Sequence, residues 1–242
     1  MTSWLTANNI TPYTYGDRVI LHSPVGRCLL VADERHVMEY LHGDSRYREL
    51  FDKLADYVPL SRQRRVREPE DYTLLTVLPN NTCNFHCGYC YAASGRNGAV
   101  LDSDKLHAAI DFFIRFKPQG FSRPLTISFM GGGEPLLSWA LVREAVVYAQ
   151  NLAARSNLRL SVNLITNGSI LTDEMLSFFL RHEVRVSVSF ELIPEVQNTQ
   201  RGSHDLVAAH IRQLIDVGVP VQLNATITPL NVGRMDEMLH IA

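Results

Sequence analysis

Apolar and polar residues alternate along the chain with the periods of strands and of helices. Near the N-terminus, the apolar runs 18–22 and 27–31 are typical of strands, and residues 23–26 supply a turn between them. Amphipathic helical patterns follow over 33–43 and about 45–57. The order hairpin, helix, helix predicts a small α+β unit.

Strand-like and helix-like runs then alternate after residue 71. This order implies parallel strands joined by right-handed crossovers, with the chemistry at the carboxyl ends of the strands. The sequence therefore predicts an α/β fold, either an open doubly wound sheet or part of a barrel. The expected strands are 74–78, 125–129, 160–165, 184–189 and 219–225, and the expected helices are 104–116, 139–155, 173–182 and 203–217.

Residues at the ends of these helices indicate where the helices begin and end. Ser103 and Thr172 are expected N-caps, and Gly218 is expected to stop the fourth helix. A fifth helical pattern opens near Arg234, and the chain stops within it at Ala242. Because no sixth strand follows, we expect a chain truncated after the fifth strand.

A charged run over 61–71 contains a proline and almost no apolar residue, so we expect a linker there. An exposed helix end is the alternative. The expected organisation is a small N-terminal domain over 1–70 and the α/β domain over 71–242.

Composition and charge narrow the possible partners. Lys plus Arg is 23 and Asp plus Glu is 25, so the net charge of -2 lacks the basic excess of most nucleic-acid or membrane-surface proteins. No apolar run approaches the roughly 18 residues of a membrane span. The first residues lack the basic and apolar regions of a signal peptide. We expect a cytoplasmic protein with no nucleic-acid or membrane partner.

Cys83, Cys87 and Cys90 follow the first expected α/β strand in a C-x3-C-x2-C spacing. In a reducing compartment such a cluster favours a metal site over disulfides. Three thiolates can bind three irons of a [4Fe-4S] cluster and leave the fourth iron open to a small molecule. A zinc site that uses His86, or three unligated thiols, are the alternatives. Cys28, in an apolar run, is expected to be a buried structural thiol.

The run from Cys83 to Cys90, followed by Tyr91, resembles the signature of the radical S-adenosylmethionine (radical SAM) enzymes. The resemblance implies a partial (β/α) barrel and a [4Fe-4S] cluster whose open iron chelates SAM. In that family, an electron from the reduced cluster cleaves SAM to methionine and a 5′-deoxyadenosyl radical, which abstracts hydrogen from the substrate. An electron donor such as a flavodoxin or ferredoxin is implied as well.

Two further motifs match the family around the cysteines. Gly132, Gly133 and Glu134 match a Gly-Gly-Glu-Pro motif that binds the SAM ammonium, and Tyr89 matches an aromatic residue that flanks the adenine. From the residues alone, glycine allows close backbone approach and the glutamate adds a charged acceptor. A plain turn, and an aromatic ring that shields the cluster from water, are the alternatives.

The later motifs match less completely. Ser189 matches a serine near the SAM ribose in a Ser-x-Asp-Gly motif, but Glu191 and Leu192 replace the Asp and Gly, which leaves the role of Glu191 open. Arg201 matches an arginine that pairs with the SAM carboxylate, a bidentate task that suits guanidinium. A solvated loop arginine is the alternative. Asn224 is a further candidate for SAM contact, with a satisfied strand asparagine as the alternative.

The order of motifs, including Thr166-Asn167-Gly168, resembles the branch of peptide maturases and anaerobic sulfatase-maturing enzymes. Many of those carry a C-terminal SPASM or twitch domain with further cysteines, and no cysteine follows Cys90 here. The N-terminal unit resembles the small winged-helix-like domain that binds the leader of a precursor peptide, with a mere capping unit as the alternative.

The resemblance thus implies hydrogen abstraction from a ribosomally synthesised peptide, which would begin cross-linking or epimerisation. A sulfatase-maturase-like or small-molecule radical SAM enzyme is one alternative, and a non-catalytic metal-binding module is another. The sequence identifies no general base.

Overall fold

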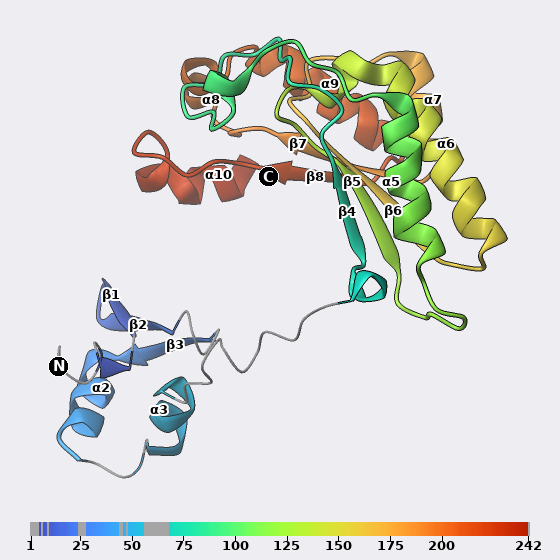
Figure 1. Cartoon of the computed structure of the whole chain (residues 1–242). Helices are drawn as coiled ribbons and strands as arrows, with labels where there is room; N and C mark the ends of the chain where they lie inside the picture. Colours follow the sequence, from blue (N-terminus) through green and yellow to red (C-terminus); the bar gives the residue numbers. More distant parts are fainter. Residues whose placement is uncertain are drawn as a thin grey trace. The chain divides into compact units, whose positions relative to one another are not determined.

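The chain divides into two units, Met1–Val66 and Arg67–Ala242, in a computed structural model (Figure 1). The structure describes residues 10–23, 28–43, 48–55 and 68–241, together with residues 5, 7, 8 and 46. Each unit has a hydrophobic core of its own. The boundary lies within the charged run 61–71, most of which is outside the described residues.

The N-terminal unit contains a three-stranded antiparallel sheet followed by two helices. Val19 and Leu21, on one face of the middle strand, are buried together with Val37 and Phe51 from the helices. The antiparallel pairing of the two expected strands and both helices are confirmed, whereas the expected turn at 23–26 lies outside the described residues apart from Ser23. The elements are β1 (Thr11–Tyr15), β2 (Arg18–Ser23), β3 (Cys28–Asp33), α2 (Glu34–Leu41) and α3 (Arg48–Ala55), and the strand order is β1-β2-β3.

The sequence analysis predicted neither strand β1 nor the turn that follows it. Residues 11–14 are all exposed, so the strand shows no apolar period to detect. Gly16, at φ 61°, forms the tight turn into β2, a conformation that favours glycine. Cys28 begins β3, but its side chain lies outside the described residues, so its expected burial stays a prediction.

The second unit contains a five-stranded parallel sheet whose strands follow chain order, β4-β5-β6-β7-β8. A doubly wound sheet reverses direction at a switch point, and this sheet does not, so the partial-barrel expectation is confirmed. The strands are β4 (Leu74–Val77), β5 (Leu125–Phe129), β6 (Leu160–Thr166), β7 (Val184–Ser189) and β8 (Val221–Asn224). The helices are α5 (Ser103–Arg115), α6 (Trp139–Arg155), α7 (Asp173–Arg181), α8 (Pro194–Gln200), α9 (His204–Asp216) and α10 (Met235–Ile241).

The two faces of this sheet differ in polarity. Ile127, Leu164 and Val186 represent the apolar face, which is buried against the helices. Figure 1 shows α5, α6 and α7 along one side of the sheet. The opposite face is largely polar, as expected for a lumen rather than a second core. Aligned positions on it include Thr76, Ser128, Asn163 and Arg185 in one row, Ser187 and Gln222 in the next, and Ser189 and Asn224 at the carboxyl ends.

The helix ends correct one prediction and confirm two. Asp102, not Ser103, caps α5, because its carboxylate accepts a hydrogen bond from the Lys105 amide at 3.0 Å. Ser103 is the first residue of the helix itself. Thr172 caps α7 as expected, and Gly218 follows α9 at φ 85°. None of the helices in the described part of the chain is long and apolar enough to cross a membrane.

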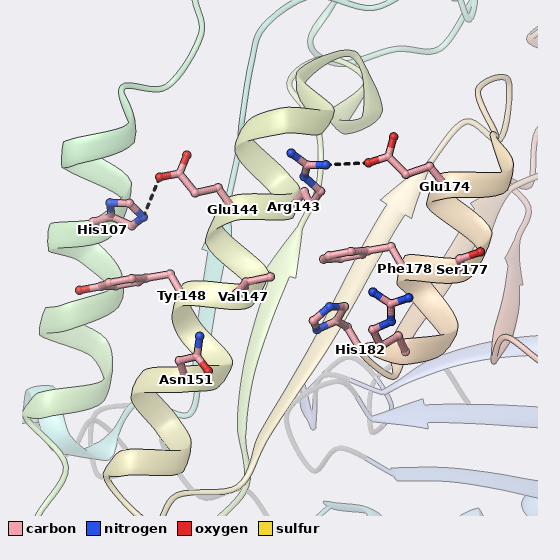
Figure 2. A pocket seen from close by; sticks show the side chains of 11 residues that line it. His107, Arg143, Glu144, Val147, Tyr148, Asn151, Glu174, Ser177, Phe178 and His182 are labelled. Atoms are coloured by element: carbon pink, nitrogen blue, oxygen red, sulfur yellow. Dashed lines mark hydrogen bonds and ion pairs between the residues drawn. The ribbon is translucent and has the colours of Figure 1, made fainter.

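A surface hollow of about 740 Å³ lies among α5, α6 and α7 (Figure 2). Pairs of side chains bridge the helices along it: His107 Nε2 lies 3.5 Å from Glu144 Oε1, and Arg143 Nη1 lies 2.8 Å from Glu174 Oε1. None of the residues predicted for the site lines this hollow. We therefore regard it as a feature of the outer helical layer.

Candidate functional site

A second cavity, of about 390 Å³, lies at the carboxyl ends of the parallel strands. Every residue that the sequence analysis assigned to the cluster or to SAM lines this cavity, apart from Asn224. Their separate binding roles stay predictions. The nine residues are Cys83, Cys87, Tyr89, Cys90, Gly132, Gly133, Glu134, Ser189 and Arg201.

The three cysteines share one loop that begins soon after β4. Each is a free, half-buried thiol, and the buried ring of Phe85 anchors the loop in the core. The Phe85 amide donates to Cys83 Sγ at 3.4 Å. Burial raises the pKa of the Cys87 thiol, although the nearby charge of Arg201 acts in the opposite direction. Iron binding at Cys87 would therefore displace a proton.

The chemistry of this donor set fits a [4Fe-4S] cluster. Three thiols on one loop face one cavity, and a cluster binds each thiolate through a separate iron. Among the residues that the structure describes, no three His, Cys, Asp or Glu side chains are arranged to hold a single metal ion. His86 is exposed and does not line the cavity, so it does not join the three thiols.

The glycines after β5 contact the segment that leads into the cysteine loop. A Cβ atom on Gly133 would lie 1.9 Å from the Thr82 carbonyl oxygen, and one on Gly132 would lie 2.5 Å from Asn81 Oδ1. The amide of Glu134 donates to that Thr82 oxygen at 2.7 Å. The close approach of the two backbones explains why glycine is needed here.

Glu134 connects the carboxyl ends of β5 and β6. Its buried carboxylate accepts hydrogen bonds from Thr166 Oγ1 at 2.6 Å, from the Asn167 amide at 2.7 Å and from the Leu136 amide at 3.1 Å. Burial raises the pKa of this carboxyl, and the three donors offset part of the rise. Both carboxylate oxygens already have partners, so the side chain fixes the glycine loop against the Thr166-Asn167-Gly168 turn.

Tyr89, Glu191 and Arg201 form a hydrogen-bonded group on one wall of the cavity. Arg201 Nη1 donates to the Tyr89 hydroxyl at 2.5 Å and lies 3.6 Å from Glu191 Oε1, and the Tyr89 hydroxyl donates to the same Glu191 oxygen. The Arg201 side chain is only 10% exposed, so the alternative of a solvated loop arginine is wrong. Burial and the bond to Glu191 raise the pKa of Tyr89, which keeps its phenol protonated.

Glu191, whose role the sequence left open, is the fully buried centre of this group. Its second oxygen accepts from the Thr226 amide at 3.0 Å, and its own amide donates to Gln197 Oε1 at 2.9 Å. Leu192, in the place of the family's glycine, adopts φ 67°, the conformation that favours glycine. The residue that replaces the motif's glycine thus has a backbone conformation that glycine adopts readily.

Several other residues of the site were missed or only partly predicted. Arg96 and Thr226 line the cavity, and no motif singled them out. Asn167, from the expected turn, donates to Asn84 Oδ1 at 2.9 Å and so connects that turn to the cysteine loop. Asn224 accepts a hydrogen bond from the Gln222 side chain at 3.3 Å and does not line the cavity.

Comparison with known proteins identifies the class. The Radical SAM superfamily model matches residues 77–242, so this chain belongs to the radical SAM superfamily. Among individual relatives, it is 27% identical over 171 residues to the uncharacterized protein MJ0907 of Methanocaldococcus jannaschii. The aligned region covers 68% of this chain and 56% of that protein. It is 26% identical over 145 residues to the serine-type anaerobic sulfatase-maturating enzyme of Klebsiella aerogenes, covering 60% of this chain and 35% of that enzyme.

A solved structure has the same fold. The structure of native anSMEcpe with bound AdoMet and Cp18Cys peptide superposes with a TM-score of 0.61 at 17% identity, over 69% of this chain and 46% of that one. The chain therefore spans about half, or less, of the length of the proteins it matches.

Proposed function

We propose that Cys83, Cys87 and Cys90 hold a [4Fe-4S] cluster, that SAM binds in the adjoining cavity, and that the enzyme abstracts hydrogen from a peptide. When bound, the cluster supplies the electron that splits SAM into methionine and the 5′-deoxyadenosyl radical. One observation carries the proposal: three free thiols and the residues matched to SAM binding line one cavity at the carboxyl ends of the strands.

The chain's own residues would orient SAM in this cavity. Arg201 presents a guanidinium suited to a carboxylate, and Tyr89 and Glu191 hold it in place. The backbone of Gly132 and Gly133 offers close approach to the SAM ammonium, because no side chain intervenes. Ser189, at the end of β7, offers its hydroxyl to the ribose.

The polar face of the sheet supports a peptide as substrate. Side chains such as Ser128, Asn163 and Ser187 can donate to and accept from main-chain amides. An apolar substrate would leave these groups without partners, which is costly once they are buried. The anSMEcpe structure also has both AdoMet and the Cp18Cys peptide bound.

The N-terminal unit supports recognition of a precursor peptide. Among the described residues, β3 is an edge strand, and edge strands accept an added peptide strand. A hollow of about 250 Å³ adjoins it. The hollow is lined by Arg18, Leu30, Val31, Ala32, Asp33, His36 and Phe51. We propose that a leader segment pairs with β3 and fills this hollow.

The first experiment is anaerobic reconstitution with iron and sulfide, followed by SAM and a strong reductant, with 5′-deoxyadenosine measured by mass spectrometry. We expect product from the wild-type chain and at least a hundredfold less from Cys83→Ala, because one iron loses its ligand. Cys28→Ala, in the other unit, is the matched control and should retain activity. Undiminished product from Cys83→Ala would overturn the ligand assignment.

Sulfatase maturation is the second candidate, favoured by the similarity to the Klebsiella aerogenes enzyme. Adding the Cp18Cys peptide to the same reaction tests it. A changed peptide mass together with 5′-deoxyadenosine would favour this candidate. Formation of 5′-deoxyadenosine with an unchanged peptide would favour a different peptide substrate.

A further inference from the structure

Two polar side chains outside the predicted ligand set donate to cysteine sulfurs. Arg96 Nη2 lies 3.5 Å from Cys90 Sγ, and Asn167 Nδ2 lies 3.7 Å from Cys83 Sγ. The two donors come from different parts of the chain, the segment after the cysteines and the turn after β6. Each therefore approaches a different thiol of the candidate cluster site.

Both donors are held in place by other contacts. Arg96 Nη1 donates to the Phe85 carbonyl at 2.7 Å, which fixes the guanidinium against the cysteine loop. Asn167 Nδ2 also donates to Asn84 Oδ1 at 2.9 Å, while Asn167 Oδ1 accepts from the Ser169 amide at 2.9 Å. These contacts thus orient both donors toward the sulfurs.

Donors in this position affect the reduction of a cluster. Reduction adds one negative charge, part of which is carried by the sulfur ligands. Hydrogen bonds to the sulfurs and a neighbouring positive charge stabilise that added charge and raise the reduction potential. The cationic guanidinium of Arg96 should act more strongly than the neutral amide of Asn167.

We infer that Arg96, assisted by Asn167, sets the reduction potential of the cluster held by Cys83, Cys87 and Cys90. The inference rests on the proposed function. Arg96 does not bind iron in this scheme. It acts through Cys90 as a positioning residue whose charge makes the cluster easier to reduce.

The test is a redox titration of the cluster-loaded chain of residues 1–242, monitored by electron paramagnetic resonance. Iron content and absorbance are measured first for every variant. We expect Arg96→Gln to lower the ratio of reduced to oxidised cluster at least tenfold at a fixed potential. For a one-electron couple, this corresponds to a midpoint potential lower by about 59 mV. Arg96→Lys, which keeps the charge but not the fork, should give a smaller shift.

Two further variants complete the design. Asn167→Ala should shift the midpoint in the same direction by less than Arg96→Gln, and it serves as the test if Arg96→Gln does not assemble a cluster. Arg143→Gln, on the outer face of α6, removes a charge elsewhere and should leave the midpoint unchanged. A normal cluster with a wild-type midpoint in both Arg96→Gln and Asn167→Ala overturns this inference alone. A wild-type chain that assembles no cluster overturns the proposed function as well.

Discussion

Gly133 lies where the loop after β5 meets the segment that leads to the cysteines, and the contact leaves no room for a side chain. A Cβ there would lie 1.9 Å from the Thr82 carbonyl oxygen, 2.4 Å from Asn80 Oδ1 and 2.5 Å from the Thr82 carbonyl carbon, and both Thr82 atoms are backbone. Backbone cannot rotate away as a flexible side chain can. Any substitution must therefore move one loop relative to the other.

Gly133→Ala should consequently damage both stability and the site. We expect a loss of about 1–3 kcal/mol in the free energy of unfolding, typical of overpacking, and at least a tenfold loss of SAM affinity. Urea titration and equilibrium dialysis measure the two effects. Gly233→Ala is the control, because a Cβ there meets nothing within 4 Å. Equal behaviour of the two variants would contradict the role given to the loop contact.

At this scale, local motifs were easier to predict than distant partners. The three cysteines and the glycines are identified by spacing along the chain. Tyr89 and Glu191 are 102 positions apart in the sequence, and no local pattern predicts the contact between them. Arg96 resembles any loop arginine until its distance to Cys90 is known. The site residues that the sequence missed are therefore those defined by tertiary contacts.

At the scale of elements, the connection from α7 to β7 contains a strained residue. Glu183 is exposed and adopts φ 51°, directly after the helix and before Val184 begins the strand. This left-handed conformation costs a residue with a Cβ about 1–2 kcal/mol. Glycine would avoid that cost but loses about 0.5–1 kcal/mol through the entropy of the unfolded chain.

Glu183→Gly should therefore stabilise the protein by roughly 0.8 kcal/mol, the difference between the middle values of these two ranges. Urea unfolding should show a higher midpoint with an unchanged slope. Glu183→Ala removes the same carboxylate but keeps a Cβ, so it should show no such gain. Equal stabilisation by both variants would indicate that the charge, and not the backbone, is responsible.

The elements themselves could be predicted where one face is buried. All five parallel strands and the helices α5, α6, α7 and α9 alternate clearly, because each packs one apolar face on the core. Strand β1 and helix α8 were missed. Residues 11–14 of the strand are all exposed, and the helix has only seven residues, PEVQNTQ, with little apolar pattern. The cap of α5 was displaced by one residue because Asp102 and Ser103 are both good cap residues.

At the scale of the whole molecule, the proposed cofactor site and the proposed leader site belong to different units. All the residues that line the candidate cofactor cavity belong to the unit Arg67–Ala242, which has its own core. The proposed leader site belongs entirely to the other unit. The chemistry and the recognition of the peptide should therefore be separable.

Removal of residues 1–66 should leave the SAM chemistry intact. We expect the shortened chain to assemble its cluster and to form 5′-deoxyadenosine within about threefold of the rate of the chain 1–242, while peptide-dependent turnover is lost. Iron analysis and mass spectrometry of both products measure this. A shortened chain that folds and holds its cluster but cannot cleave SAM would show that the SAM chemistry is not separable from the N-terminal unit.

The chain order of the parallel strands also sets the order in which the site is made. The cysteine loop leaves the ribosome soon after β4, the first strand of the sheet, and Arg201 follows 112 residues after its partner Tyr89. At about 5–20 residues per second, that interval lasts roughly 6–22 s. For those seconds the nascent thiols lack the wall that later encloses them. Oxygen present during translation would thus reach the three cysteines before the rest of the site exists.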